Sequence, residues 1–279
     1  MNPSDLGLQE FDNYFQTLAN NEIINKKLLL EFIEESGITL QDKRFGETIK
    51  KLPNEINKNN FYDFMGSNTI LLNKIFEKNL VISDWDFFKK GIDEIFESTK
   101  NHNLGSVADY IPQLAKVSGE LYGVSICTID GQQYIKGDVD AHFCVQSCSK
   151  PITYLIAADL KSSDYVHNFI GREPSGRNFN ELCLNSEKLP HNPCINSGAI
   201  MAASLVNYRD SLADRFDTVL DYWKKLAGDT KINFSTSVYL SERQTADRNF
   251  CLGYMMQESK AFSQGKNSKY KRDWNNSDL

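Results

Sequence analysis

The stretch Phe143-Cys-Val-Gln-Ser147-Cys-Ser-Lys150-Pro-Ile-Thr-Tyr-Leu-Ile-Ala-Ala-Asp-Leu160 passes from polar, reactive residues into an apolar segment. The apolar positions between 152 and 160 occupy most faces of a helix, so the sequence predicts a buried helix here. Pro151 is tolerated only in the first turn of a helix, which places the helix start close to Ser147. Ser147 and Lys150 then lie one turn apart on the same face.

Ser147 and Lys150 are candidates for a nucleophile and its base. A buried lysine loses part of its proton affinity through desolvation, and a neutral amine can take the proton from a serine hydroxyl. Backbone N–H groups at the start of the helix would also stabilise an oxyanion. The Ser-x-x-Lys pattern recurs at Ser263–Lys266 and Ser268–Lys271, in a polar segment that could not bury a lysine. The hairpin before Ser147 and the apolar helix behind it, more than the motif itself, therefore favour Ser147.

A cysteine nucleophile is the alternative at the same place. Cys144 and Cys148 flank Ser147, and His142 is the histidine nearest to them in sequence. The six cysteines of the chain are scattered without a C-x-x-C pair, and several lie in apolar segments, as is typical of reduced core cysteines. We therefore rank a cysteine nucleophile below the pair of Ser147 and Lys150.

Length and charge exclude several classes of protein. A chain of 279 residues suits one large domain or two ordinary ones, and its 41% hydrophobic and 24% charged content is that of a soluble globular protein. The net charge of −6 gives no footprint for nucleic acid or an anionic membrane, and no apolar run is long enough to span a bilayer. The four histidines lack metal-ligand spacing, so we expect no metal and no cofactor. No targeting segment is visible, which by sequence alone indicates a cytoplasmic protein.

Residues 1–100 show helical periodicity only. Apolar residues recur at helical spacing within 11–18, 24–33 and 70–76. A fourth helix is expected over roughly 83–98, with Ser83 or Asp84 as its N-cap. Paired helices of this kind occur in EF-hands, but the acidic calcium loop with its central glycine and terminal glutamate is absent from the sequence. The inward positions predicted for the fourth helix are Trp85, Phe88, Ile92, Ile95 and Phe96.

A hairpin and two irregular segments are predicted after the helical region. Residues 124–129 and 132–136 read as strands around Asp130-Gly131, a strong short signal for a hairpin turn. Residues 171–180 are rich in Gly, Pro and Asn, which predicts a long loop of the kind that is usually functional or mobile. The polar segment 263–279 has no hydrophobic period, so we expect it to be disordered.

Two helices are expected in the last third of the chain. Apolar residues between 212 and 226 define an amphipathic helix that Gly228 closes. Ser241-Glu-Arg-Gln244 reads as a capping box that opens a helix reaching about Glu258.

Four polar residues also have structural interpretations from the sequence alone. Tyr110, beside Ile and Pro, reads equally well as a core residue. Asn196, before Ser-Gly, would serve as a helix N-cap, and Glu242 at a helix start would meet the dipole favourably. Asn249 falls in the middle of a predicted helix, where asparagine is a poor helix former, so structure explains it less well.

Together the motifs closely resemble the serine-dependent glutaminases of the kidney and liver type, whose catalytic domain is similar to serine β-lactamases and penicillin-binding proteins. They occur in family order and at family spacing over about residues 105–262. Residues 1–100 also resemble that family's EF-hand-like region, more loosely. The matching stretches are Asp109-Tyr-Ile-Pro-Gln-Leu-Ala-Lys116, Val145-Gln-Ser-Cys-Ser-Lys-Pro151, Gly171-Arg-Glu-Pro-Ser-Gly176, Pro190-His-Asn-Pro193, Asn196-Ser-Gly-Ala-Ile200 and Ser241-Glu-Arg…Asp247-Arg-Asn-Phe250.

The resemblance implies an α+β protein. We expect an N-terminal all-α, EF-hand-like module over 1–100, followed by the N-terminal part of a serine β-lactamase-like catalytic domain over 105–262 and a disordered tail over 263–279. Catalytic domains of the family continue further, so we expect a C-terminally truncated domain. The missing part would carry the Lys-Ser-Gly strand, further pocket tyrosines and the second oxyanion N–H.

The resemblance also implies the residues of the site. Ser147 would be the nucleophile, Lys150 its base and Tyr110 a proton-relay or orienting hydroxyl. Glu242 suits the ammonium group of glutamine, and asparagine amides suit either its ammonium or its carboxylate. Glu242 and Asn249, seven residues apart, would share one face of the helix predicted to start at Ser241. The substrate-binding residues implied by the family are Gln146, Asn196, Glu242 and Asn249.

The implied activity is the conversion of L-glutamine and water into L-glutamate and ammonia through a glutamyl ester of Ser147. The family also implies a homo-oligomer (dimer or tetramer), inorganic phosphate as a candidate activator, and a mitochondrial location. One alternative is a catalytically inactive truncated form that binds full-length subunits. Another is an acyl-serine hydrolase of β-lactams, against which Asn196, Glu242 and Asn249 argue, since their contacts fit a free amino acid.

Overall fold

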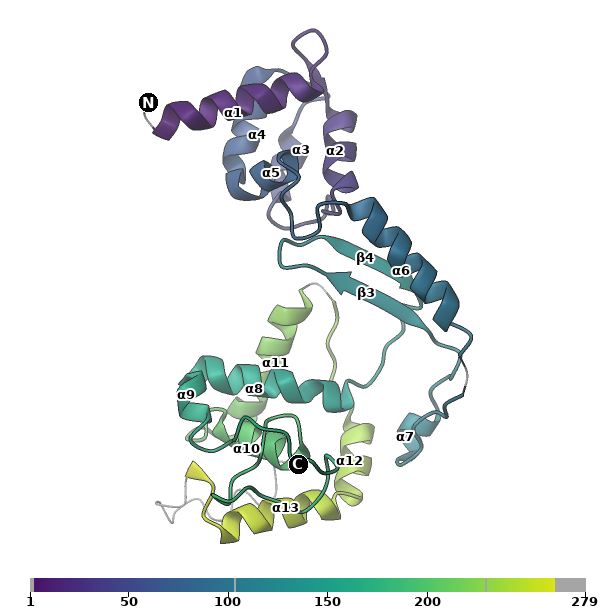
Figure 1. Ribbon diagram of the computed structural model, residues 1–279, viewed down its shortest axis with the longest axis vertical. Helices are drawn as coiled ribbons and strands as arrows, with labels where there is room; N and C mark the ends of the chain where they lie inside the picture. Colours follow the sequence, from purple (N-terminus) through teal and green to yellow (C-terminus); the bar gives the residue numbers. More distant parts are fainter. Residues whose placement is uncertain (1–2, 103, 229, 264–279) are drawn as a thin grey trace. The chain divides into compact units, whose positions relative to one another are not determined.

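The chain forms two compact units in a computed structural model that describes residues 3–102, 104–228 and 230–263 (Figure 1). The first unit comprises Met1–Ser106 and Ser118–His142, and the second comprises Val107–Val117 and Phe143–Leu279. Each unit has its own hydrophobic core, and helices outnumber strands, as expected for an α+β protein. No helix in the described ranges is long and apolar enough to span a bilayer.

Helices α1 to α6 and two pairs of short strands build the first unit. The strands β1 and β2 pair antiparallel through Ile24 and Ile56, so the prediction of helices only for residues 1–100 is wrong. Each strand runs directly into an asparagine N-cap: Asn25 accepts from the Lys27 N–H, and Asn57 accepts from the Asn60 N–H. The elements are α1 (Pro3–Leu18), β1 (Ile24–Asn25), α2 (Lys26–Glu35), α3 (Gly46–Lys51), β2 (Glu55–Ile56), α4 (Lys58–Ser67), α5 (Thr69–Phe76), α6 (Trp85–Thr99), β3 (Gly123–Cys127) and β4 (Gln133–Gly137).

Helix α6 begins where the sequence predicted. Asp84 is its N-cap and accepts from the Phe87 N–H at 2.9 Å, and Trp85 is buried. Ile95, predicted to face inward, is 59% exposed, because the helix is buried mainly at its first residue. Ile70 is likewise 79% exposed, since α5 turns its other apolar side chains to the core.

The predicted hairpin is present, and its turn is anchored to the helices of the first unit. Strands β3 and β4 pair antiparallel, and the turn closes with the Gly131 N–H donating to Thr128 O at 2.9 Å. Gly131 has φ +94°, a conformation that glycine adopts without steric cost. Asp130 accepts from Lys74 at 2.7 Å and from the Val81 N–H at 2.8 Å. The lysine contact lowers the pKa of the Asp130 carboxyl.

Gln132 is the buried centre of this anchor. Its side chain accepts from the Ile82 N–H at 3.0 Å and donates to Ile82 O and Ser36 O, each at 2.8 Å. Its exposure is 0%, so water cannot replace these partners. The hairpin and the loops after α2 and α5 are therefore joined through one amide.

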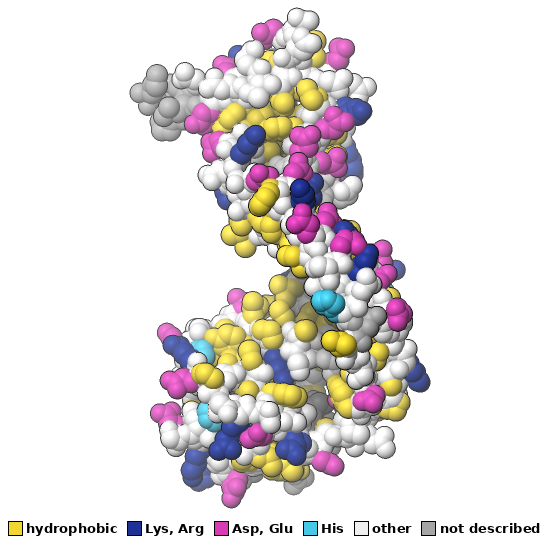
Figure 2. Space-filling model, turned by 45° about the vertical axis from the view of Figure 1, so that its right-hand side comes forward, with side chains coloured by type: hydrophobic (Ala, Val, Ile, Leu, Met, Phe, Trp, Pro, Cys, Tyr) yellow, Lys and Arg dark blue, Asp and Glu magenta, His cyan; other side chains and the backbone are white. Residues whose placement is uncertain are grey.

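The second unit is helical in its described part. Helix α8 packs on α9, α10 and α11, and α10 also packs on α13, around a core that includes Ile156, Met201 and Leu252. Leu155 on α8 is 44% exposed, so α8 is less buried than predicted, and Figure 2 shows hydrophobic side chains (yellow) on the surface of this unit. The elements are α7 (Pro112–Ala115), a 3-10 turn (Gln146–Cys148), α8 (Ser149–Lys161), α9 (Ser163–Val166), α10 (Asn196–Leu205), α11 (Leu212–Ala227), α12 (Thr236–Gln244) and α13 (Asp247–Glu258).

The capping box predicted at Ser241 is wrong. Ser235 caps α12 by accepting from the Val238 N–H, and residues 241–244 form the last turn of that helix. A new helix, α13, begins at Asp247. Glu242 and Asn249 therefore lie on two different helices and do not share one helix face, because the chain turns between Gln244 and Asp247.

The remaining predictions for this unit concern one helix, one loop and the tail. Helix α11 ends at Gly228, whose φ is +63°, so the amphipathic helix closed by this glycine is confirmed. Residues 171–180 contain no helix or strand, as predicted. Disorder was predicted for residues 263–279. Of this segment, all residues after 263 lie outside the described ranges.

Replacing Gln132 with methionine should destabilise the first unit by about 2–4 kcal/mol, because it leaves the part-buried backbone groups of Ile82 and Ser36 without their partners. Urea unfolding combined with hydrogen exchange of the Ile82 amide would measure the loss. The matched control is Gln133→Met, since Gln133 is the adjacent, exposed glutamine of the same hairpin. Equal stability of the two variants would contradict the assignment of Gln132 as an anchor.

Candidate functional site

Ser147 lies in the 3-10 turn immediately before α8. Its side chain is exposed, whereas Lys150, in the first turn of α8, is half-buried. The apolar residues of α8 that pack on the core fix this end of the helix, as the sequence predicted. An accessible hydroxyl and a sheltered amine thus stand three residues apart in the chain.

Lys150 points towards polar and aromatic partners of the same unit. Its Nζ donates to Asn196 Oδ1 at 2.7 Å and lies 5.1 Å from the centre of the Phe179 ring. Burial lowers the pKa of Lys150, and the nearby Cys194 thiol opposes this shift more weakly. Neither partner is a carboxylate, so no negative charge on these two side chains favours the ammonium form of Lys150.

Asn196 links Lys150 to a third helix. Its Nδ2 donates to Asn249 Oδ1 at 2.9 Å, so side chains from α8, α10 and α13 form one hydrogen-bonded row. The sequence allowed Asn196 to be a helix N-cap, but Ile195 occupies that position without a side-chain cap, and Asn196 is the first residue of α10. Its side-chain amide therefore bonds to Lys150 and Asn249 and does not cap the helix.

Tyr110 joins a second group of predicted residues. Its hydroxyl lies 2.7 Å from Gln146 Oε1 and 2.8 Å from Glu242 Oε1. Burial, and next the hydrogen bond to Glu242, raise the pKa of Tyr110 to about 12. The Tyr110 hydroxyl has one proton and can donate to only one of these two oxygens at a time. If the Gln146 amide turns its NH2 group towards Tyr110, the hydroxyl accepts from Gln146 and donates to Glu242, and all three side chains are satisfied.

Gln146 also carries backbone strain directly before Ser147. Its φ is +44°, in the left-handed region that costs a residue with a Cβ roughly 1–2 kcal/mol. The bond to Tyr110 is the contact that holds its side chain in the described structure. The strained residue and its anchor set how the 3-10 turn presents Ser147.

The site also contains residues that the sequence analysis did not emphasise. It gave no role to Phe179 and Cys194, and it named Cys144 only as part of the lower-ranked cysteine alternative. Phe179 O accepts from the Asn196 N–H at 2.9 Å, while the ring lies beside Lys150. Among the causes of the raised pKa of Tyr110, the smallest is the electrostatic effect of Cys144. A position within the irregular loop 171–180 has no period that would indicate its neighbours, so the sequence offered no signal for Phe179.

The two groups differ in the chemistry that they offer. The row of Lys150, Asn196 and Asn249 offers an amine of lowered pKa and two amide groups, and Glu242 beside Tyr110 offers a carboxylate. Among the residues that the structure describes, no three His, Cys, Asp or Glu side chains gather as metal ligands would. The arrangement suits acyl transfer to Ser147 from a ligand that carries an amine and a carboxylate.

The lowered pKa of Lys150 makes a prediction about pH. The rate at which an activated ester or fluorophosphonate acylates Ser147 should rise with pH and level off below the usual range of a lysine, as the amine loses its proton. Asn196→Leu removes an acceptor of the charged form and should move this profile to lower pH. Mass spectrometry of the labelled chain gives the rate. Lys150→Arg is the control that should abolish the profile, and a Lys150→Arg protein with an unchanged profile would refute the role of base.

Two substitutions of Gln146 separate backbone strain from hydrogen bonding. Gln146→Gly and Gln146→Ala both lose the bond to Tyr110, but glycine adopts a positive φ without cost. We expect the glycine variant to keep a Ser147 labelling rate several-fold higher than that of the alanine variant. The free energy of unfolding should be compared in parallel. Equal labelling rates would mean that the left-handed backbone does not present Ser147.

Comparisons with known proteins identify the family of this chain. The family model described as Glutaminase matches residues 105–271. The mitochondrial liver isoform of glutaminase from Mus musculus is 40% identical over 264 residues, which cover 91% of this chain and 44% of the mouse protein. This chain therefore spans less than half the length of that relative.

Two solved structures are similar in fold. One, described as probable glutaminase ybaS, has a TM-score of 0.60 at 31% identity and aligns with 64% of this chain and 58% of its own. Another, Mglu in its glutamate form, has a TM-score of 0.56 at 32% identity and aligns with 61% of this chain and 39% of its own. The family match covers more than half of the residues and includes every predicted site residue. The chain belongs to the glutaminase family.

Proposed function

We propose that this chain hydrolyses L-glutamine to L-glutamate and ammonia. The observation that carries the proposal is the hydrogen-bonded row of Lys150, Asn196 and Asn249 behind Ser147, within a chain of the glutaminase family. The solved structure of Mglu, described as a glutamate form, supports a ligand of this class.

In the proposed reaction, Ser147 Oγ attacks the side-chain carbonyl carbon of glutamine while the neutral Lys150 amine takes the hydroxyl proton. The C–N bond then breaks, the proton passes to the leaving nitrogen, and ammonia departs from a glutamyl ester of Ser147. Water, giving a proton back to Lys150, attacks the ester, releases glutamate and restores the serine hydroxyl. The reaction changes no oxidation state, and every proton that leaves one group is taken up by another, so the proposed steps need no cofactor.

The proposed ligand contacts follow from charge. Glu242, hydrogen-bonded to Tyr110, would hold the substrate ammonium, and the amides of Asn196, Asn249 and Gln146 would hold the carboxylate or orient the substrate. Tyr110, with its raised pKa, stays protonated near neutral pH and acts as an orienting donor. Phosphate activation, assembly into a homo-oligomer and a mitochondrial location, the last included in the mouse relative's name, belong to the same proposal.

We also propose that the first unit contains an EF-hand-like module and that the second is β-lactamase-like. The order of helix, short strand and helix occurs twice, as α1-β1-α2 and α3-β2-α4, and the two strands pair. This arrangement supports an EF-hand pair without calcium ligands. The 3-10 turn with Ser147, followed by a helix with Lys150, supports the second likeness.

Purified chain should release equal amounts of glutamate and ammonia from glutamine, and Ser147→Ala should lower the rate by at least about 10³-fold. Coupled assays for both products measure this, with circular dichroism as the check of folding. Asparagine and a chromogenic β-lactam serve as substrates that should not be turned over. A folded chain without turnover would refute the proposal and favour the alternative of a non-catalytic partner of full-length subunits.

A further inference from the structure

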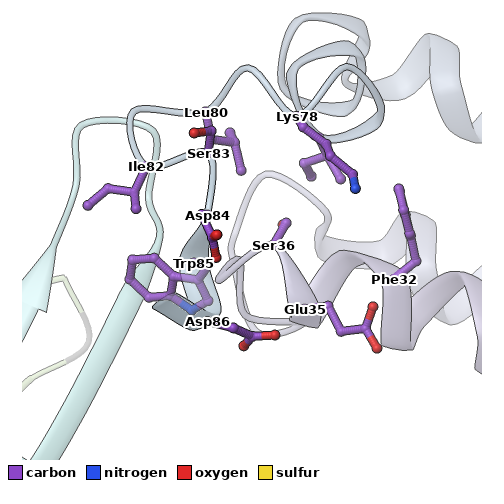
Figure 3. A pocket seen from close by; sticks show the side chains of 11 residues that line it. Phe32, Glu35, Ser36, Lys78, Leu80, Ile82, Ser83, Asp84, Trp85 and Asp86 are labelled. Atoms are coloured by element: carbon purple, nitrogen blue, oxygen red, sulfur yellow. The ribbon is translucent and has the colours of Figure 1, made fainter. Parts of the chain in front are cut away.

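Helix α6 of the first unit is apolar on two sides. One side packs on the hairpin of β3 and β4, beside which the helix lies in Figure 1. The ring of Phe96 lies 4.9 Å from that of Tyr122, and a Cβ at Gly137 would lie 2.8 Å from Phe96. Figure 3 shows the Trp85 indole and the Asp86 side chain leaving the first turn in different directions, and Trp85 is buried. The packing of the first unit therefore accounts for this side of α6.

The other side of α6 carries apolar side chains that the described chain leaves largely uncovered. Phe87 is 76% exposed and Ile95 is 59% exposed. They lie eight residues apart with Gly91 midway, and this spacing places all three residues on one helix face. Within the described residues, no neighbouring segment comes within 4 Å of the place that a Cβ at Gly91 would take, so the glycine leaves an open gap in this face. A helix that is apolar on two sides is typical of one that contacts protein on both.

The charges beside this face differ from the other charges of α6. Lys90 and Glu94 are exposed, lie along the same edge of the face, and take part in no ion pair within the described residues. The unpaired cation and the unpaired anion of this helix thus lie at its uncovered face, which has no net charge. The other charged side chains of α6 are all in ion pairs: Asp86 with Lys89 at 2.7 Å, Asp93 with Lys136, and Glu97 with Lys136 at 3.3 Å.

These positions are complementary to a second copy of the same helix. When two α6 helices pack antiparallel with Gly91 against Gly91, a two-fold axis relates them, and each residue meets the one equally far beyond the glycine. Phe87 then lies beside Ile95 of the partner subunit, and the gap at each glycine lets the helices approach closely. Lys90 is offset from Glu94 of the partner subunit by about 3 Å along the axis, on the same edge. Because the axis repeats each contact, two apolar contacts and two ion pairs form.

We propose that two copies of this chain associate through their α6 helices, packed antiparallel around Gly91. A strongly basic or acidic partner fits less well, because it would repel either Lys90 or Glu94. The contact gives a surface to the homo-oligomer proposed above, but it does not depend on the glutaminase activity, and its tests measure association only. A single helix pair buries little area compared with the interface of an obligate dimer, so we expect association at micromolar concentrations.

Sedimentation of the full chain, over concentrations on the order of 1–100 μM, measures this association. Phe87→Ser should raise the dissociation constant at least about tenfold, because one substitution removes both symmetry-related apolar contacts. The matched control is Ile70→Ser on α5, since Ile70 is 79% exposed and lies on another helix. Both side chains are exposed, so neither substitution should disturb the fold. A parent chain that stays monomeric, or equal effects of the two variants, would overturn the proposal.

Charge variants identify the contact as one between copies. Lys90→Glu places a carboxylate opposite Glu94 of the partner subunit, and Glu94→Lys places an ammonium group opposite Lys90 of the partner subunit. Each variant alone should therefore associate several-fold more weakly, and less so in high salt. An equimolar mixture of the two variants should associate about as tightly as the parent chain, because every repelling pair becomes an attracting one. Variants without effect, or weakened variants that mixing does not restore, would contradict the proposed contact.

Discussion

The candidate site depends on the hydrogen bond between Lys150 and Asn196. A lysine withdrawn from water needs an acceptor, because a buried ammonium without one would be costly. Asn196 Oδ1 meets this need at 2.7 Å without bringing a negative charge, so desolvation still dominates and the pKa stays lowered. The bond also joins α8 to α10, and through Asn249 to α13, so side chains from three helices fix the position of the Lys150 amine.

In the first unit, the side-chain amide of Gln132 likewise joins separate segments of the chain through hydrogen bonds. Gln132 satisfies one backbone N–H and two carbonyl groups that the hairpin and helices would otherwise bury without partners. Asp130, in the same turn, adds an ion pair to Lys74 and a bond to the Val81 N–H. The hairpin lies within the residues that match the family model, yet it belongs to the same compact unit as the N-terminal helices, and the buried side chain of Gln132 bonds to the loops that follow α2 and α5.

Local signals in the sequence sufficed where a feature depends on near neighbours. Asp130-Gly131 indicated the hairpin turn, Asp84 the start of α6, and Pro151 the start of α8, because turn geometry and helix-end preferences act over a few residues. Features set by tertiary packing could not be read in this way. Ser241 has a capping-box pattern, but the chain was already helical there. Ile95 has helical spacing, but no core covers it.

Six of the predicted site residues form two hydrogen-bonded groups of three, although the reason given for pairing Glu242 with Asn249 was wrong. Glu242 and Asn249 do not share a helix face, and each instead joins a different group, Glu242 with Tyr110 and Asn249 with Asn196. Family resemblance supplied these residues without their geometry. Phe179 is the opposite case, a site residue that the sequence did not indicate. It lies in a loop without hydrophobic periodicity, so its contact with Lys150 depends on tertiary structure that the sequence pattern does not reveal.

The identity of residue 196 as asparagine follows from these constraints. An aspartate there would accept from Lys150 equally well, but its negative charge would raise the pKa of the lysine and oppose the lowering caused by burial. It would also lose the NH2 group that donates to Asn249, placing two oxygens against each other. A leucine would leave the lysine ammonium without its acceptor. An amide accepts from the lysine, donates to Asn249 and remains neutral, so the row that joins three helices also leaves Lys150 without an anionic partner among its members.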